Sequence, residues 1–260
     1  MLVIWPTETT WNEGSMPTIA AVADIHCHEH MRGQLAEVFR DVNDRAGVLV
    51  LAGDLTASGQ VSEARELLRE LRPVTIPVVA VLGNHDFEHQ QQEQIHDLLK
   101  ASGIHLLDGD SVELDVQGER IGFAGTKGFA GGFGRYLLTG FGEQMIKDFV
   151  LEGMVEVEKL ERAISQLHSD RRVVVLHYSP VRETLTGEPL ELYPFLGNSE
   201  LSRPIDNFGA DVVFHGHSHY GSLFGHTRAG IPVFNVSQTL VVSYHLFEMP
   251  VRAGLEAAGE

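Results

Sequence analysis

Short apolar runs alternate with stretches of helical spacing through the first hundred residues. Three runs are apolar at every position, at residues 19–23, 48–52 and 78–82. This is typical of strands in a sheet that helices cover on both faces. Apolar residues at helical spacing fill the intervals, over residues 34–44, 62–71 and 91–102. This alternation predicts parallel strands joined by right-handed crossovers, with Ser58 or Ser62 capping the second helix and Gly103 ending the third.

The pattern changes in the second half of the chain. Residues 111–116 and 120–124 read as strands joined by a hairpin turn at 117–119. A glycine-rich loop (125–142), a helix (143–168), a strand (173–176) and a long polar, proline-containing connection (180–204) follow. Short strands are expected at residues 211–214, 222–224, 233–236 and 241–247. We therefore predict an α/β fold with more antiparallel pairing in this half, a four-layer α-β-β-α sandwich of two mixed sheets with helices outside.

A single domain is the simplest organisation for a chain of this length. We expect it to span residues 17–250, followed by a C-terminal tail at 251–260. Residues 1–16 lack a clear period and are expected to form an N-terminal arm, or to precede a functional start at Met16. An ordered strand on the domain edge is the alternative for this segment.

Five apolar runs, beginning at residues 19, 48, 78, 173 and 211, each stop at residue types that bind metals. The endings are Asp24-Ile-His26, Gly53-Asp54, Gly83-Asn84-His85-Asp86, His177 and Gly216-His217-Ser218-His219. In open α/β sheets, ligands bind in the crevice outside the carboxyl ends of the strands. We therefore expect these endings to converge on one site. Oxygen and imidazole donors without a thiolate suit Mn, Fe, Ni or Zn.

Together, the five endings resemble the calcineurin-like metallophosphoesterase family. The family pattern is D-x-H, G-D, G-N-H-[DE], H and G-H-x-H, and the resemblance runs from Thr18 to Val242. It implies two adjacent metal ions with Asp54 as the shared carboxylate. The resemblance assigns Asp24, His26, Asp54 and His219 to one ion, and Asp54, Asn84, His177 and His217 to the other. Such pairs lie roughly 3.5–4 Å apart and clamp both oxygens of an in-line displacement.

His85 lies outside this ligand set, and with Asp54 it is the expected catalytic residue. In the family the matching histidine points at the substrate. His85 could donate a proton to the leaving oxygen or stabilise charge on the phosphoryl oxygens, and a structural role stays open. Asp86 could orient it. Of the remaining histidines, His215 is expected to be structural, and His28 either contacts substrate or belongs to a histidine-rich turn.

The glycine-rich segment 125–134 allows two interpretations. Lys127 and Arg135 could supply charge to a phosphate-binding loop. The segment lacks the residue order G-x-x-x-x-G-K-[ST] of the P-loop that binds nucleoside triphosphates. Alternatively, it is a surface loop whose aromatic residues form a substrate wall, namely Phe129, Phe133 and Tyr136. We expect this loop and residues 182–203 to select the substrate.

The motifs indicate a hydrolase of small phosphoesters. Protein serine/threonine phosphatases carry Asp-Arg-Gly soon after the residue that matches Asp54, and this chain does not. Gly-Asp-Leu-Thr followed by Gly-Asn-His-Asp is similar to the small bacterial-type phosphodiesterases, which include cyclic-nucleotide enzymes. A phosphomonoesterase of a small metabolite and a scaffold protein on the same fold are the alternatives. Asp24-Ile-His26-Cys-His28 also resembles the opening of barrel amidohydrolases, but the hairpin at 112–124 argues against that fold.

The composition of the chain limits the kinds of molecule that it is expected to bind. A net charge of −17 disfavours nucleic acid and other large anions, unless metal ions reverse the sign locally. No run reaches the roughly 18–20 apolar residues of a membrane span, and residues 1–16 lack the features of a secretory signal. The single cysteine, Cys27, fits a reducing compartment. We therefore expect a cytoplasmic protein with a small phosphoester substrate, and its oligomeric state stays open.

Overall fold

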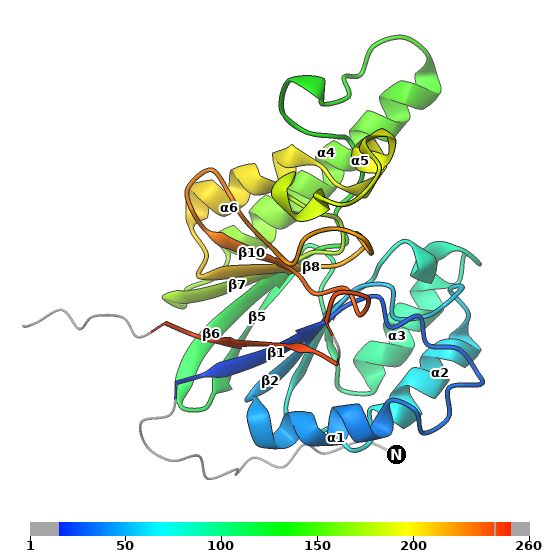
Figure 1. Cartoon of the computed structure of the whole chain (residues 1–260), viewed down its shortest axis with the longest axis vertical. Helices are drawn as coiled ribbons and strands as arrows, with labels where there is room; N and C mark the ends of the chain where they lie inside the picture. The colour runs from blue at the N-terminus through cyan, green and yellow to red at the C-terminus, as the bar shows by residue number, and fades with distance from the viewer. Residues whose placement is uncertain (1–15, 242, 251–260) are drawn as a thin grey trace, which may run out of the picture.

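Two β-sheets lie face to face in the computed structural model, which describes residues 16–241 and 243–250 (Figure 1). The first sheet has the order β11-β1-β2-β3-β4. Its strands are β1 (Thr18–Val22), β2 (Val48–Ala52), β3 (Val78–Val81), β4 (His105–Leu106) and β11 (His245–Glu248). β1 to β4 pair in parallel, and β11 runs antiparallel to β1. The predicted arm, apart from Met16, and the predicted tail lie outside the described residues.

The second sheet is also mixed, with the order β5-β6-β7-β8-β10-β9. Its strands are β5 (Asp110–Val116), β6 (Glu119–Gly125), β7 (Arg171–Val175), β8 (Val212–His215), β9 (Phe224–His226) and β10 (Pro232–Asn235). The pairs β5/β6 and β9/β10 are antiparallel, and the inner pairs are parallel. The predicted hairpin is present, and Gln117 and Gly118 have φ of 54° and 86°, as a two-residue hairpin turn requires.

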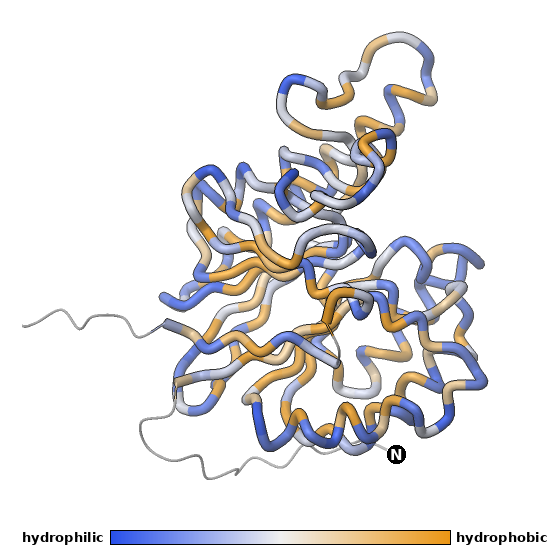
Figure 2. Tube along the Cα trace, viewed as in Figure 1, coloured by the Kyte–Doolittle hydropathy of each residue, from blue (hydrophilic) through white to orange (hydrophobic). Residues whose placement is uncertain are grey.

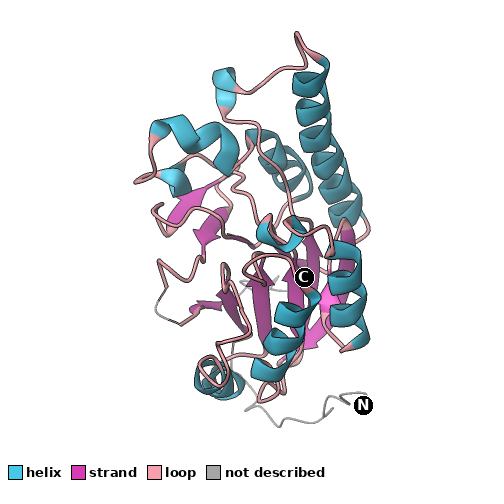
Figure 3. Ribbon diagram, turned by 90° about the vertical axis from the view of Figure 1, so that its right-hand side faces the viewer, coloured by secondary structure: helices cyan, strands magenta, loops and turns pink. Residues whose placement is uncertain are grey.

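Helices cover the outer face of each sheet, which confirms the predicted sandwich (Figures 1 and 3). α1 (Ala36–Arg45), α2 (Val61–Glu70) and α3 (Gln92–Ala101) lie on the first sheet. α4 (Gln144–Ser165), α5 (Tyr193–Leu196) and α6 (Ser202–Phe208) lie on the side of the second. Within the described ranges, no helix is long and apolar enough to cross a membrane.

Apolar side chains from both sheets fill the space between them, and the strands that face each other there are largely coloured as hydrophobic in Figure 2. Val50 and Val81 from the first sheet and Phe123 and Phe214 from the second are fully buried there. Burying a side chain of this size contributes roughly 1.5–3 kcal/mol. The outward faces of the inner strands, such as β2, β3 and β8, are buried as well, under the helices. Burial on both faces explains why these inner strands are almost entirely apolar.

The start of α2 differs from the expectation. Its N-cap is Gln60, not Ser58 or Ser62. The side chain of Glu63 accepts hydrogen bonds from the backbone N–H groups of Ser58 and Gln60, at 2.9 and 3.2 Å. A glutamate in the third helical position can bind the N–H groups that precede the helix in this way. Ser62 therefore lies inside the first turn.

The segment 180–204 also differs, because it contains short helices where an irregular connection is expected. Three one-turn 3₁₀ helices, η3 (Glu183–Leu185), η4 (Leu190–Leu192) and η5 (Ser199–Leu201), accompany α5 and the start of α6. Pro194 lies at the start of α5, and Pro204 in the first turn of α6. Proline is tolerated in the first turn of a helix because the N–H it lacks has no partner there. The prolines therefore mark helix starts.

Candidate metal centre

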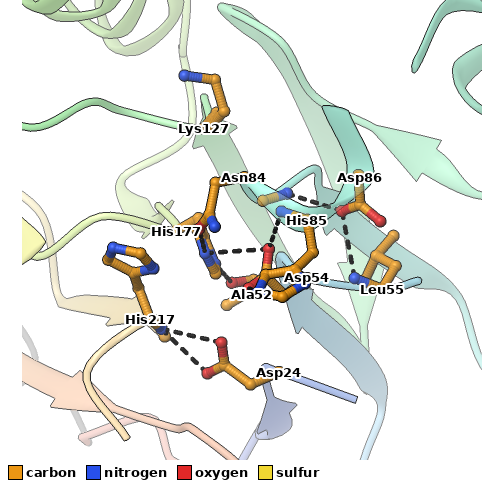
Figure 4. A network of polar contacts seen from close by, with 12 residues as sticks. Asp24, Ala52, Asp54, Leu55, Asn84, His85, Asp86, Lys127, His177 and His217 are labelled. Atoms are coloured by element: carbon orange, nitrogen blue, oxygen red, sulfur yellow. Dashed lines mark hydrogen bonds and ion pairs between the residues drawn. The ribbon is translucent and has the colours of Figure 1, made fainter. Parts of the chain in front are cut away.

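The turns that follow five strands carry the predicted ligands to one place, and Figure 4 labels five of these ligands, Asp24, Asp54, Asn84, His177 and His217. From the first sheet, Asp24 and His26 follow β1, Asp54 follows β2, and Asn84 follows β3. From the second, His177 follows β7, and His217 and His219 follow β8. We refer to these seven residues as the Asp–His cluster. Between the sheets, Ala23 N–H donates to the carbonyl of Val236 at 2.8 Å, which joins the end of β1 to the residue after β10.

Two groups within the cluster have the geometry to hold a cation. Asp24, His26, Asp54 and His219 form one group, and Asp54, His177 and His217 form the other. Within each group the candidate donor atoms lie within 4.8 Å of one another. Asn84 Oδ1 is 3.0 Å from His177 Nε2, which adds the amide oxygen to the second group. The structure thus brings together the two sets that the family resemblance implied, and they share Asp54.

The backbone around the cluster adopts an unfavourable conformation. Asp24, His26, Asp54 and His217 have φ of 58°, 46°, 50° and 70°. A left-handed backbone costs roughly 1–2 kcal/mol for an ordinary residue. Elsewhere in the described chain, only Gln90 and Gln117 among non-glycine residues have positive φ. Such concentration of strain is typical of functional sites, where the surrounding structure holds side chains in place.

Two glycines allow the turns to approach each other. Gly53 has φ of 90°, and a Cβ atom there would lie 2.3 Å from His177 Nδ1. A Cβ atom on Gly83 would lie 2.2 Å from the backbone nitrogen of Asp54. Since both distances are far below van der Waals contact, any larger residue would separate Asp54 from His177.

Both carboxylates of the cluster are buried and held in the ionised form. Burial alone would raise the pKa of Asp54, but the facing His177 ring and the His85 N–H, which donates to Oδ1 at 2.8 Å, lower it. Burial likewise opposes ionisation of Asp24, yet its hydrogen bond with His219 keeps the pKa of Asp24 lowered. Asp24 also accepts the backbone N–H of His217 on both oxygens, at 3.0 and 3.1 Å. The cluster therefore presents two negative charges.

The imidazoles face these carboxylates with defined nitrogen atoms. His177 Nδ1 lies 3.0 Å from the carbonyl of Ala52, so that its N–H donates to this oxygen and Nε2 faces Asp54 at 3.3 Å. Burial favours the neutral ring, but Asp54 raises the pKa of His177 to about 9. For His217, burial and the nearby His177 lower the pKa to about 3.

His26 supplies the clearest sign that a cation fits this site. Its Nε2 is buried and has no hydrogen-bond partner among the described residues, although Asp54 Oδ2 lies 3.9 Å away. Burying a polar atom without a partner costs free energy, and a metal–ligand bond would remove that cost. The donor set of carboxylate, imidazole and one amide oxygen fits Mn, Fe, Zn or Ni. Cys27 adds no thiolate, because burial raises the pKa of its thiol to about 12.

His85 lies beside the cluster with one nitrogen fixed. Its Nδ1 is 2.8 Å from the carbonyl of Ala57, and its Nε2 is 4.0 Å from Asp54 Oδ2. Because Nδ1–H donates to this carbonyl, Nε2 is the ring nitrogen that faces the cluster.

Among the described residues, the carboxylate of Asp86 forms no hydrogen bond or ion pair with the ring of His85. Its buried carboxylate accepts hydrogen bonds from the backbone of Leu55, Thr56 and Gly83, and from the Thr56 hydroxyl. Burial and the nearby Asp54 raise the pKa of Asp86 to about 6. The carbonyl of Ala57 therefore orients His85, and Asp86 ties together the turns that carry Asp54 and Asn84.

Other candidates lie outside the cluster. His215 is fully buried, with Nδ1 2.8 Å from the carbonyl of Gly216 and Nε2 2.9 Å from the Thr184 hydroxyl. His28 is exposed and belongs to neither metal group. The ammonium group of Lys127 lies over the ring of Phe129 at 4.8 Å and points away from Asp54 (Figure 4).

One neighbour of the cluster was missed by the sequence analysis. The buried ring of Tyr178 packs against His217, with centroids 4.4 Å apart, and against His177 at 5.6 Å. A tyrosine after a buried strand has no spacing that distinguishes it from a core residue, so no sequence signal could have found it.

Comparison with known proteins agrees with this geometry. The family model described as calcineurin-like phosphoesterase matches residues 17–221, a span that contains the whole cluster. The chain belongs to the calcineurin-like phosphoesterase family. The chain is 25% identical to the uncharacterized protein YpbG of Bacillus subtilis (strain 168) over 248 residues, which are 92% of this chain and 77% of that protein.

Two further similarities are more distant. The DNA double-strand break repair protein Mre11 of Aeropyrum pernix is 32% identical over 123 residues, which cover 41% of this chain and 29% of Mre11. A hypothetical protein of Thermus thermophilus, known from its crystal structure, has a TM-score of 0.52 and 17% identity. That alignment covers 84% of this chain and 75% of the other. At this identity the likeness concerns the fold alone.

Proposed function

We propose that this phosphoesterase is a dinuclear-metal hydrolase that cleaves phosphoester bonds of small substrates. The observation that carries the proposal is the position of Asp54, which belongs to both candidate metal groups. Its two oxygens face different histidines, Oδ1 towards His177 and Oδ2 towards His26. A carboxylate in this position is suited to bridge two ions.

Each residue of the cluster has a proposed role. Asp24, His26, Asp54 and His219 would hold one ion, and Asp54, Asn84, His177 and His217 the other. When bound, such a pair supplies positive charge for the phosphoryl oxygens and activates water as the nucleophile. The donor set supports Mn, Fe, Zn or Ni. Because the cluster carries two carboxylates, the ions are also what would allow an anionic substrate to approach.

His85 is the proposed proton donor. Its Nδ1–H donates a hydrogen bond to the carbonyl of Ala57, so the proton that His85 would transfer is the one on Nε2. Donation from Nε2 to the leaving oxygen would neutralise the alkoxide as it forms. The ring of His85 is partly exposed, so that a substrate can reach it from solvent.

Small phosphodiesters are the proposed substrates, with cyclic nucleotides among them. The absence of Asp-Arg-Gly after Asp54 and the Gly-Asp-Leu-Thr motif support this preference over phosphoproteins. The net charge of −17 also disfavours large anionic partners. We extend the proposal to a cytoplasmic location, which the single thiol at Cys27 supports.

Metal analysis of Asp54→Asn tests the shared carboxylate. We expect the variant to lose metal and to lose turnover of a nitrophenyl phosphodiester, since one negative charge disappears from both groups at once. Asp97→Asn, on the exposed side of α3, removes the same charge elsewhere and should keep metal and activity. Full metal content with normal turnover in Asp54→Asn would refute the dinuclear proposal.

Matched nitrophenyl esters test the substrate class separately. We expect kcat/KM for the diester to equal or exceed that for the monoester. If the monoester were favoured by more than about a hundredfold, near 2.7 kcal/mol of transition-state binding, a phosphatase would replace the phosphodiesterase proposal.

A further inference from the structure

A basic cavity of about 510 Å³ opens beside the second sheet, away from the residues that would hold metal. Its wall is formed by η2 (Gly134–Tyr136), the segment that follows β7, the start of α6 and the residues after β9. Three arginines line it, one from each of three separate segments: Arg135, Arg182 and Arg228. None of them belongs to the Asp–His cluster.

The charge of this cavity is opposite to that of the whole chain. The chain has 36 acidic and 19 basic residues, whereas the cavity is lined by these three arginines and one carboxylate, Glu183. Across the described ranges, no carboxylate forms an ion pair with Arg135, Arg182 or Arg228. The adjacent Arg203, by contrast, is paired with Glu161 at 3.1 Å and with Glu200 at 3.7 Å. Three like charges around one cavity repel one another until an anion enters.

Aromatic rings hold two of these guanidinium groups in place. Arg182 lies over the ring of Tyr193 at 5.4 Å, and Arg135 lies over Tyr136 at 4.7 Å. A guanidinium that stacks on a ring uses its face, which leaves N–H groups at its edge for planar, bidentate contacts with an oxyanion. The hydroxyl-bearing side chains of Ser199 and Ser202 line the same cavity. We infer that this cavity is a second anion site, which binds a phosphate group.

The short helix α5 connects the cavity to the metal centre. Tyr193, at its start, contacts Arg182 and also packs against Phe133, with ring centroids 6.5 Å apart. Two residues later, the carbonyl of Phe195 lies 3.2 Å from His217 Nε2. Because α5 contacts both sites, one molecule could occupy the two of them. The bound phosphate group is then a second phosphate of the substrate, an interpretation that rests on the proposed function. Alternatively, the phosphate group belongs to a separate ligand.

Calorimetry with pyrophosphate on metal-free protein, after removal of the chelator, tests the site without any turnover. Wild type should bind, and the affinity should fall as NaCl screens the charges. Arg182→Gln and Arg228→Gln should each weaken binding about tenfold, the effect of losing one charged hydrogen-bonding partner. Arg203→Gln makes the same charge change next to the cavity and should bind like wild type. No binding by wild type, or equal weakening in all three variants, would overturn the inference.

Kinetics on metal-loaded protein then distinguish the two sources. The substrates are nitrophenyl phosphodiesters of one nucleoside, with and without a second phosphate. A rise in KM of about tenfold in Arg228→Gln, confined to the substrate with the second phosphate, supports the site and assigns it to the substrate. Unchanged KM for both substrates, together with weakened pyrophosphate binding, supports the site and assigns it to a separate ligand. Because calorimetry requires no metal, an inactive enzyme would leave the anion-site test intact.

Discussion

At the scale of single residues, the neighbours of each histidine decide its chemistry. His177 and His217 lie in the same cluster with ring centroids 4.9 Å apart. Asp54 raises the pKa of His177 to about 9, although burial opposes this, whereas burial lowers the pKa of His217 to about 3. Identical side chains thus favour opposite charge states in the metal-free protein, so that of these two rings it is His177 from which a metal ion would have to displace a proton.

Replacing His85 tests its proposed role as proton donor. In His85→Ala we expect both metals to remain and the hydrolysis rate to fall by about 10²–10³, as when one transition-state donor is lost. The loss should shrink for a nitrophenolate leaving group, which needs little protonation. Rates on alkyl and nitrophenyl esters give this comparison, and equal losses on both would leave His85 with charge stabilisation only.

His215 should make stability depend on pH. Burial lowers the pKa of His215 to about 4, so the folded protein keeps this ring neutral while the unfolded chain takes up a proton near pH 6.5. Its contribution is complete above pH 6.5 and is lost as pH falls from there to about 4, by up to about 3 kcal/mol. Urea unfolding of metal-free wild type and His215→Gln between pH 4.5 and 7.5 should show a smaller pH slope in the variant. Parallel curves would contradict this prediction.

The convergence of the candidate ligands could be predicted from sequence because these residues follow strands directly. Asp24, Asp54, Asn84 and His177 each end an apolar run, and parallel topology brings such ends to one edge. Tyr178 and Arg228 could not be identified from the sequence, since their positions beside other residues depend on neighbours that are distant in sequence. Arg228 is basic like many surface residues, and only the folded chain shows it beside Arg182.

At the scale of elements, tight turns after the strands place the candidate metal ligands. Strand positions were predicted well where apolar runs were buried on both faces, as in β2. β4 was missed because its two residues, His105 and Leu106, are too few to show a period. The same limit applies to the short helices of 183–208, whose boundaries depend on contacts with β9 and α4.

Gly53→Ala tests the turn after β2. The new Cβ would lie 2.3 Å from His177 Nδ1 on a backbone with φ of 90°, so we expect both strain and displacement of His177. The free energy of unfolding should fall by well over about 1 kcal/mol, and metal content should fall with it. Gly118→Ala is the matched control, because its φ is 86° and nothing lies within 4 Å of the new atom. That variant should lose about 1 kcal/mol and keep its metal, and equal behaviour of the two would show that His177 can move freely.

At the scale of the whole molecule, the contact between the sheets holds the sandwich together. Phe214 of β8 is fully buried there and packs against Phe234 and Phe247. Phe247 belongs to β11 of the first sheet, so this aromatic group spans both sheets. The arrangement could not be read from the sequence, because nothing in residues 245–248 indicates that they pair with β1.

Phe214→Ala measures that contact. Removing a fully buried phenylalanine typically costs about 3–5 kcal/mol, and we expect a loss in this range by chemical unfolding. Phe141→Ala is the control, since that side chain is 85% exposed. It should change stability by less than about 0.5 kcal/mol. A small loss in Phe214→Ala would show that the sheets are held mainly elsewhere.

The pairing of β11 with β1 also affects how the protein emerges from the ribosome. β1 is the first strand of the described chain to be synthesised, but its outer neighbour is residues 245–248, among the last of the described chain. Until those residues appear, one side of β1 exposes N–H and C=O groups without strand partners, in a strand whose side chains are almost all apolar. Open apolar edges of this kind invite pairing with other chains. A nascent chain of this protein therefore carries an unpaired, aggregation-prone strand edge for most of its synthesis, and this edge is covered only when β11 emerges and pairs with β1.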